Sequence, residues 1–152
     1  MTPEQLQQLL AIAAQLCILF EGVYLRPYLC PRGIPTIGVG ATFYEDGRPV
    51  TLLDPPITRE RAMQLLQWHL QRHFLPKVAK LCPGADTPPR LAALLDFAFN
   101  LGAGNLQAST LRAKVNAGLW AEVPEQLMRW NKAGGRVLAG LTRRRAAEAA
   151  LV

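Results

Sequence analysis

The sequence contains few cysteines, and they form no recognisable pairing pattern. Cys17, Cys30 and Cys82 are odd in number and widely spaced. This favours free thiols made in a reducing compartment over a disulfide framework. No CxxC pair is present, so a zinc or redox motif is not expected either. We therefore predict no metal site and no cofactor.

A long apolar segment is also lacking. The apolar stretch from Leu9 to Phe20 is interrupted by Gln15 and is too short to span a bilayer. Met1 is followed by Thr2-Pro3-Glu4 and not by the Lys or Arg that signal peptides carry near their start. We expect neither a signal peptide nor stable membrane insertion.

Charged residues are scarce, at 18% of the chain, and half of all residues are hydrophobic. This composition argues against intrinsic disorder, and 152 residues are enough for one domain with a sizeable core. The net charge of +6 favours acidic partners. The basic residues are scattered except for Arg143, Arg144 and Arg145, and no zinc-finger or RNA-binding signature accompanies them. We expect a monomer that does not bind nucleic acid.

The first half of the chain predicts one helix followed by a small sheet. Helical spacing of apolar residues runs from about Pro3 to Phe20, and Glu21-Gly22 ends that helix. From Val23 to Val50, prolines and glycines punctuate short runs of β-branched and aromatic residues. This pattern predicts two or three antiparallel strands, with a hairpin turn at Glu45-Asp46-Gly47.

The remainder of the chain predicts helices alone. A helix capped by Thr58 extends to His73, and a strongly apolar central helix begins at Thr87-Pro88 and ends at Gly102. Three shorter helices are predicted after it, near Gln107 to Ala117, Leu119 to Lys132 and Thr142 to Leu151. The fold class is therefore α+β with segregated elements. A groove is expected where the sheet meets the helices.

Glu21 has the most suggestive setting of the acidic residues. It follows an apolar helix face and precedes a glycine and the sheet, so it lies at the expected groove. Partial burial there would keep the carboxyl protonated and ready to donate a proton. From composition and periodicity alone, a solvated Glu at a helix end is the favoured interpretation.

The residues after Glu21 resemble the active-site segment of phage-type lysozymes, the endolysins of glycoside hydrolase family 24. In that family a Glu is followed, after eight residues, by Asp or in some members Cys, and after five more by Thr at the start of an Ile-Gly-x-Gly turn. This chain has Glu21-Gly22, then Cys30, then Thr36-Ile37-Gly38-Val39-Gly40. The segments 97–105, 109–111 and 140–145 resemble the end of the central helix, the turn after it and the basic C-terminal helix of the same family.

The resemblance implies a mostly helical lysozyme-like fold. A small antiparallel sheet lobe, at about 21–58, and a helical lobe, at about 84–152 with the N-terminal helix, would be joined by a long helix. Residues 1–152 would form one catalytic domain, with no separate wall-binding module. The implied reaction is hydrolysis of the β-1,4 bond between N-acetylmuramic acid and N-acetylglucosamine in bacterial peptidoglycan.

The resemblance also assigns roles to residues. Glu21 would be the general acid, and Cys30 and Thr36 would position the attacking water on the opposite face of the sugar ring. An arginine of the C-terminal helix, Arg144 with Arg143 as the alternative, would tune Glu21. The arginine run could equally be a solvated face that attracts the anionic wall.

Cys30 stands where many relatives carry a carboxylate, and this difference bears on mechanism. A thiol, with a pKa near 8.5 in free cysteine, is mostly neutral at pH 7 and is a poor substitute, whereas the thiolate could accept a proton. Cys30 could line the water site or merely pack there. Thr36 could hold water through its hydroxyl or serve only as a strand residue.

Other candidate residues have simpler interpretations. Phe99 and Asn100 could contact the N-acetyl sugars, although Phe99 could equally belong to the core. His69 and His73 are better explained as a pair on a helix surface than as metal ligands. Glu45 and Asp46 lie at the predicted hairpin turn, and either could replace the missing carboxylate only if that turn folded over the groove. Trp68, Trp120 and Trp130 are expected to pack.

The alternatives to a hydrolase are a wall-binding protein that has lost turnover through the change at Cys30, and a lytic transglycosylase. Without an export signal, the protein would accumulate in the host cytoplasm and reach the periplasmic wall after the membrane is permeabilised.

Overall fold

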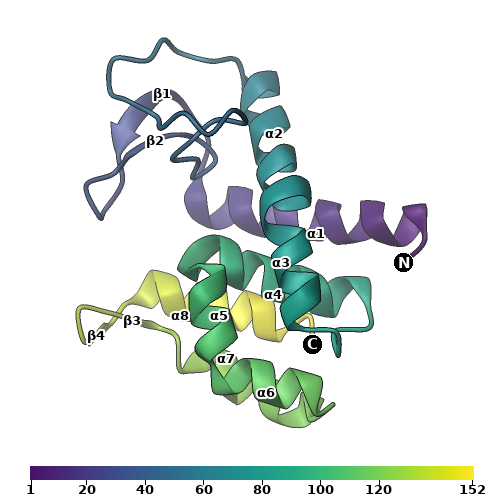
Figure 1. The fold of residues 1–152 in the computed structure, drawn as a ribbon. Coiled ribbons are helices and arrows are strands. Elements are labelled where there is room, and N and C mark those ends of the chain that lie inside the picture. The colour runs from purple at the N-terminus through teal and green to yellow at the C-terminus, as the bar shows by residue number, and fades with distance from the viewer.

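The computed structural model describes all residues 1–152 and shows a sheet lobe and a helical lobe (Figure 1). Helix α1 (Pro3–Glu21) crosses the molecule between them. It begins with a capping box, in which the Thr2 hydroxyl accepts from the Gln5 amide and the Gln5 side chain accepts from the Thr2 amide. Reciprocal bonds of this kind satisfy amides that a helix start leaves unpaired.

The sheet lobe is built on one antiparallel hairpin. Strand β1 (Tyr24–Leu29) pairs with β2 (Pro35–Gly38), and Tyr28 lies opposite Thr36. The predicted turn at Glu45-Asp46-Gly47 is present, closed by a single bridge between Phe43 and Pro49 and not by a full pair of strands. A small apolar cluster fills this lobe and consists of Ile37, Ala41, Tyr44, Val50 and Leu65.

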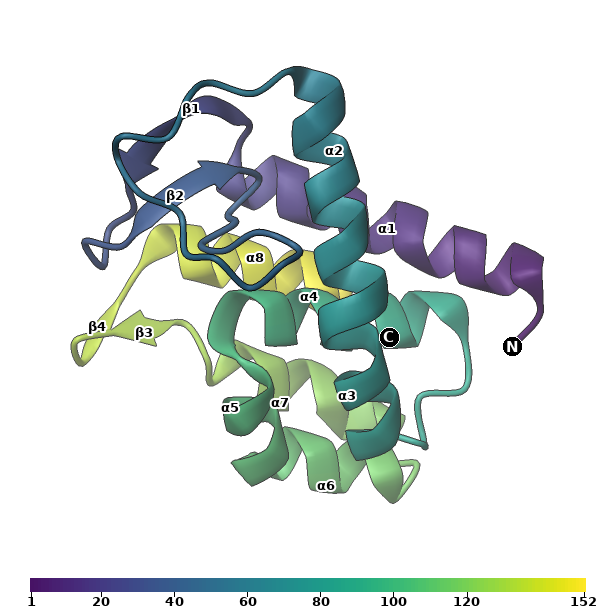
Figure 2. The same cartoon turned by 45° about the horizontal axis from the view of Figure 1, so that its top comes forward.

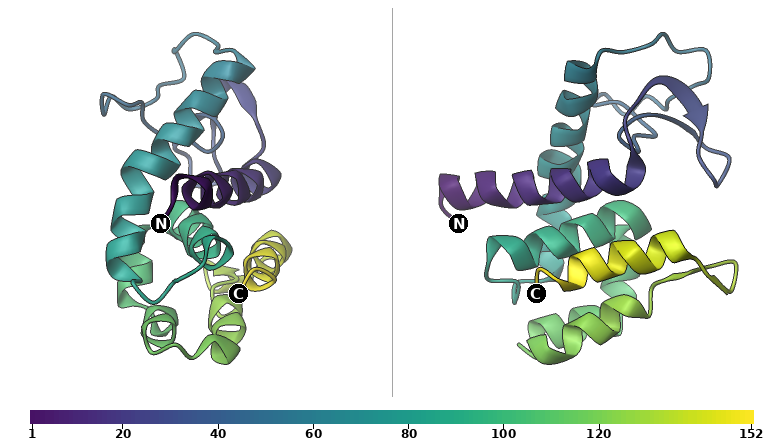
Figure 3. Two further views of the ribbon diagram at one scale, coloured as in Figure 1. Left: turned by 90° about the vertical axis from the view of Figure 1, so that its right-hand side faces the viewer. Right: turned by 180° about the vertical axis from the view of Figure 1, so that it is seen from behind.

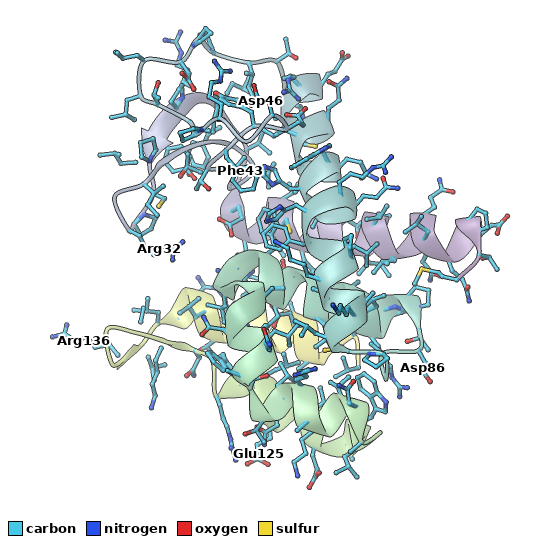
Figure 4. All side chains as sticks on the ribbon, in the orientation of Figure 1. Arg32, Phe43, Asp46, Asp86, Glu125 and Arg136 are labelled. Atoms are coloured by element: carbon cyan, nitrogen blue, oxygen red, sulfur yellow. The ribbon has the colours of Figure 1, made fainter.

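One long helical segment joins the lobes (Figure 2). It comprises α2 (Arg59–Trp68), a π-helical stretch η1 (His69–Phe74) and α3 (Leu75–Leu81). The sequence predicts neither the π-helix nor the extension beyond His73. The interpretation of His69 as a surface residue is wrong, because its side chain is buried and its Nε2 donates to the Phe43 carbonyl at 2.9 Å. Phe43 lies in the sheet lobe beside this helical segment (Figure 4).

The helical lobe is centred on α4 (Pro88–Leu101), which runs beside α1 and α8 (Ala139–Ala149) (Figure 3). The predicted helix near 107–117 is two helices, α5 (Ala103–Ala108) and α6 (Thr110–Asn116), because Ser109 caps a new one with its hydroxyl. The predicted helix at 119–132 contains only the short turn η2 (Trp120–Glu122) and α7 (Val123–Met128).

A second hairpin, β3 (Lys132–Ala133) and β4 (Arg136–Val137), follows α7. The sequence does not predict it, because Gly134 and Gly135 are read only as a break between helices. Both glycines have positive φ and form the turn.

The main core lies between α1, α4 and the helices around them. It includes Leu9, Ala13, Leu94, Phe97 and Leu127, each fully buried. Burial of apolar surface of this kind contributes about 25 cal/mol per Å² and is the dominant stabilising term. None of the helices combines the length and the apolar character that crossing a bilayer requires.

Gly84 offers a test of this packing. A Cβ at position 84 would lie 2.5 Å from the Val115 carbonyl oxygen and 3.0 Å from the Asn116 Cα, both backbone atoms. Gly84→Ala should therefore lower the free energy of unfolding by about 2 kcal/mol, the usual cost of overpacking, in urea denaturation. Gly104→Ala is the matched control, because position 104 lies in α5 with no heavy atom within 4 Å of the added Cβ. Equal stability of the two variants would contradict this account.

Candidate functional site

Glu21 is the last residue of α1 and lies at the junction of the lobes. Gly22 ends the helix with φ 75° while its amide still donates to the Ile18 carbonyl at 3.0 Å. Few residues other than glycine adopt this backbone conformation, so the chain can leave the helix and enter β1 directly after Glu21. The Glu21 side chain is 24% exposed, which leaves it reachable from solvent.

The turn after β2 touches the Glu21 carboxyl group. Ile37 and Ala41 exchange backbone hydrogen bonds of 2.9 and 3.1 Å, and Gly38 and Gly40 in the turn between them have positive φ. A Cβ at position 40 would lie 3.1 Å from both Cδ and Oε2 of Glu21. Glycine at position 40 therefore lets backbone approach the carboxyl group closely. This contact explains why a glycine is needed within the motif.

Arg144 of α8 holds the other side of Glu21. Its Nη1 donates to Glu21 Oε1 at 2.6 Å, while its Nε and Nη2 donate to the two carboxylate oxygens of Asp96 at 2.9 and 2.8 Å. Although burial opposes it, hydrogen bonding to Asp96 and the charges of Asp96 and Glu21 raise the pKa of Arg144 above its ordinary value. Arg144 therefore faces Glu21, whereas Arg143 is exposed.

The interpretation of the arginine run as a solvated face is wrong for two of its members. Arg144 and Arg145 are buried, and only Arg143 is exposed. Arg145 donates to Glu148 Oε1 at 2.7 Å and to Asn100 Oδ1 at 2.9 Å. Buried charges of this kind require partners, and α8 finds them on α4 and on its own next turn.

Asp96 and Cys17 also belong to this site, although the sequence does not single them out as functional residues. Asp96 is fully buried, and the Cys17 thiol, one turn before Glu21 on α1, donates to Asp96 Oδ1 at 3.4 Å. Burial and the neighbouring Asp96 carboxylate raise the pKa of Cys17 well above its ordinary value, so this thiol stays protonated. A single acid within an otherwise apolar helix was the available signal, because such an acid is almost never buried without a partner.

Cys30 and Thr36 lie together at the turn end of the β1–β2 hairpin. The Cys30 amide donates to the Ile34 carbonyl at 3.0 Å, and the buried Thr36 hydroxyl donates to the same carbonyl at 2.8 Å. Although burial opposes it, hydrogen bonds from the Ile34 and Arg32 backbone and the Thr36 hydroxyl, with the charge of Arg32, together lower the pKa of the Cys30 thiol from its ordinary value. Figure 4 shows Arg32 at the turn between the two strands.

Tyr28 connects Cys30 and Thr36 with Glu21. It lies directly opposite Thr36 across the sheet and two residues before Cys30, so the three residues share one face of the hairpin. Burial, followed by the negative charges of Glu21, Tyr24 and Cys30, raises the pKa of Tyr28 to about 12. The Tyr28 phenol is therefore a protonated hydrogen-bond donor that lies near enough to Glu21 and Cys30 for their charges to act on it.

The remaining candidates have contacts of their own elsewhere in the structure. Phe99 is half-buried with its ring 5.3 Å from that of Phe74, and the Asn100 carbonyl oxygen accepts from Arg145. Glu45 makes a two-bond ion pair with Arg61 at 2.7 and 2.8 Å, beside a hollow of about 360 Å³ that Asp46 also lines. No group of three or more His, Cys, Asp and Glu side chains is arranged to hold a metal ion.

Both the sequence and the fold match known proteins. The family described as phage lysozyme matches residues 19–148. The chain is 35% identical over 137 residues to the endolysin of Bacillus phage B103, covering 87% of this chain and 49% of that protein. It is 46% identical over 131 residues to the SAR-endolysin of bacteriophage PS119, covering 84% of this chain and 73% of that protein.

The match extends to three dimensions. The structure superposes on a variant of phage P22 lysozyme with a TM-score of 0.77 and 30% identity, over 91% of this chain and 93% of that one. The expected lysozyme-like fold is thereby confirmed. The chain spans about half the length of the Bacillus phage relatives it matches.

The surroundings of Cys30 predict selective thiol chemistry. Because backbone amides and the Thr36 hydroxyl favour its thiolate, Cys30 should react with iodoacetamide at a lower pH than free cysteine does. Cys17 and Cys82 serve as internal controls, since both are buried and burial raises the pKa of Cys82 to about 11. Mass spectrometry of the native protein across pH 6 to 9 would follow all three sites. Thr36→Val should move the Cys30 midpoint upward, and labelling of Cys17 or Cys82 ahead of Cys30 would contradict the assignment.

Proposed function

Because the chain belongs to the phage lysozyme family, we propose that it hydrolyses the β-1,4 bond between N-acetylmuramic acid and N-acetylglucosamine in bacterial peptidoglycan. The observation that carries this proposal is the placement of Glu21. Its carboxyl group is held by Arg144 and by the Gly40 turn, and it remains partly open to solvent beside the hairpin that carries Cys30 and Thr36. A fixed acid next to a second polar group is what glycoside hydrolysis requires.

Glu21 acts as the general acid in this proposal. As the glycosidic bond breaks, the leaving oxygen takes the proton from the Glu21 carboxyl group. The hydrogen bond from Arg144 orients the carboxyl group through one oxygen, Oε1. The other oxygen, Oε2, faces the Gly40 turn. This arrangement restricts the rotamers of Glu21 before substrate arrives, which is how a positioned acid gains efficiency.

Cys30 and Thr36 position the water that attacks the anomeric carbon from the opposite face of the ring. The single proton of the Thr36 hydroxyl lies within reach of the Ile34 carbonyl and the Cys30 sulfur, so the lone pairs of its oxygen are left to accept a bond from water. The lowered pKa of Cys30 favours a thiolate, which can accept the second proton of that water. The proton that Glu21 loses and the proton that Cys30 gains balance over the reaction, and the product has inverted stereochemistry.

We extend the proposal to the residues that contact substrate and to the way in which the protein reaches the cell wall. Asn100 keeps its amide N–H groups for an N-acetyl carbonyl, and Phe99 offers an aromatic face beside it. Arg144 contributes through Glu21. The protein would act on the periplasmic wall of its host after the membrane has been permeabilised, and its net charge of +6 favours the anionic wall.

Glu21→Gln should reduce the clearing of outer-membrane-permeabilised cells by at least about a hundredfold, because the amide keeps the shape of the carboxyl group but has no acidic proton. Glu45→Gln is the matched control, since Glu45 is also half-buried and paired with an arginine. The control should keep its activity, and both variants should remain folded by circular dichroism. Full activity of Glu21→Gln would remove Glu21 from the mechanism.

Position 30 should tolerate aspartate better than alanine. Cys30→Asp should retain or raise the clearing rate, because a carboxylate accepts a proton from water, whereas Cys30→Ala should lower it. Cys82→Ala is the control, because it removes a buried thiol directly after the end of α3 and should affect only stability. Equal rates for Cys30→Asp, Cys30→Ala and the unchanged protein would show that position 30 takes no part in the reaction.

Two other outcomes would replace the proposal. Wild-type protein that sediments with purified walls without clearing them would be a wall-binding protein. Mass spectrometry of released fragments separates hydrolysis, in which the reducing end gains one water, from a transglycosylase reaction, which leaves anhydro-sugar ends.

A further inference from the structure

Asp96 is a buried carboxylate that touches neither solvent nor the Cys30 and Thr36 side of the site. It lies in the middle of α4 with no exposed surface, and it receives two hydrogen bonds from Arg144. Those bonds use the Nε and Nη2 edge of the guanidinium group. Only the third nitrogen, Nη1, is directed to Glu21. The two carboxylates therefore share one cation, one fully buried and one at the surface.

The two hydrogen bonds to Asp96 fix the orientation of the Arg144 guanidinium group. A bidentate pair holds the plane of a guanidinium group, so Asp96 determines where Nη1 points. The Cys17 thiol supports Asp96 from α1, with Sγ 3.4 Å from Oδ1. The guanidinium carbon also lies 5.6 Å from the centre of the Phe20 ring. Glu21, Phe20 and Cys17 all belong to the last turns of α1, so Arg144 is fitted to the end of that helix.

The charge of Arg144 also acts on the Glu21 carboxyl group. A cation 2.6 Å from Glu21 favours the ionised form of a carboxyl group, and an ionised Glu21 cannot donate a proton. A second negative charge on the same cation opposes that effect. We propose that Asp96 is a positioning residue that offsets the charge of Arg144 at Glu21, so that removing the Asp96 charge makes Arg144 favour the ionised form of Glu21 more strongly. This inference rests on the proposed role of Glu21 as general acid.

The other charged and titratable groups around this pair fit that role. Arg145 is occupied by Glu148 and Asn100, and burial together with the neighbouring Asp96 raises the pKa of Glu148 well above its ordinary range. Cys17 also stays protonated. Although burial opposes it, the hydrogen bonds and charge of Arg144 keep the pKa of Asp96 below its ordinary value. On the sheet side, burial and nearby negative charge raise the pKa of Tyr28 to about 12. Although burial opposes it, hydrogen bonds and the charge of Arg32 lower the pKa of Cys30 from its ordinary value.

The test is the pH profile of activity of Asp96→Asn. Asparagine keeps the size of the side chain and one acceptor but loses the charge, so Arg144 is no longer offset. The alkaline limb of kcat/KM on permeabilised cell walls should move about one pH unit lower, with a roughly tenfold loss at neutral pH that is recovered on acidification. A residue that serves only to hold the fold would lower activity by the same factor at every pH.

Two further variants keep the test decisive. Val115→Ala creates a cavity in the core away from the site, and it should lower the melting temperature without moving the limb. Asp96→Ser removes the same charge but leaves room for water beside Arg144, so it carries the test if the asparagine variant does not fold. An unmoved limb, or a uniform loss across pH in the folded variant, would overturn the inference.

The outcome also separates this inference from the proposed function. Wild-type protein that clears no walls at any pH would refute the hydrolase before any variant is made. A wild-type hydrolase whose alkaline limb stays in place in both Asp96 variants would refute only the role of Asp96.

Discussion

The bridge that Arg144 makes between Asp96 and Glu21 is the interaction on which the site depends. It joins three helices that are distant in sequence, since Glu21 ends α1, Asp96 lies in the centre of α4 and Arg144 lies in α8. Removing one partner of such a buried pair leaves an uncompensated charge, at a typical cost of about 3 to 5 kcal/mol. The position of the acid is therefore coupled to the packing of the helical lobe. A substitution in α8 or α4 that moves Arg144 or Asp96 would therefore shift the Glu21 carboxyl group without contacting it.

The second half of the site belongs to the other lobe. Cys30 and Thr36 are held by hydrogen bonds to the backbone at residue 34, within a single hairpin, and do not rely on the helical core. Gly40 is the physical link between the halves, because its bare Cα lets the sheet lobe rest against the Glu21 carboxyl group. Glu21 is thus positioned by a long-range contact with Arg144, whereas Cys30 and Thr36, the proposed water-binding groups, are positioned by local hydrogen bonds. The geometry between them depends on the Gly22 exit from α1 and on how the lobes pack.

The sequence predicted the local parts of this arrangement better than the long-range parts. The prolines and glycines between Val23 and Val50 placed antiparallel strands in that segment, and apolar periodicity placed α1 from about Pro3 to Phe20, because both signals are local in the sequence. The π-helical stretch at His69–Phe74 and the β3–β4 hairpin were missed, since apolar periodicity does not distinguish a π turn, and two glycines fit a helix break as well as a turn. Asp96 was missed because its partners come from α1 and α8, which no pattern within α4 reveals.

The burial of two consecutive arginines follows from the same long-range constraint. Adjacent residues on a helix point about 100° apart, so both can be buried only where a helix is covered on two sides. α8 meets that condition by packing against α4 and α1, and Arg144 and Arg145 each find a carboxylate on the side they face. Arg145 leaves Nε and Nη1 without partners, as does Glu148 with Oε2. That pair is less well satisfied than the Arg144 pair, in which one nitrogen edge is saturated by Asp96 and the remaining nitrogen reaches Glu21. The better-satisfied arginine is the one at the proposed active site, where the orientation of a guanidinium group fixes the orientation of an acid.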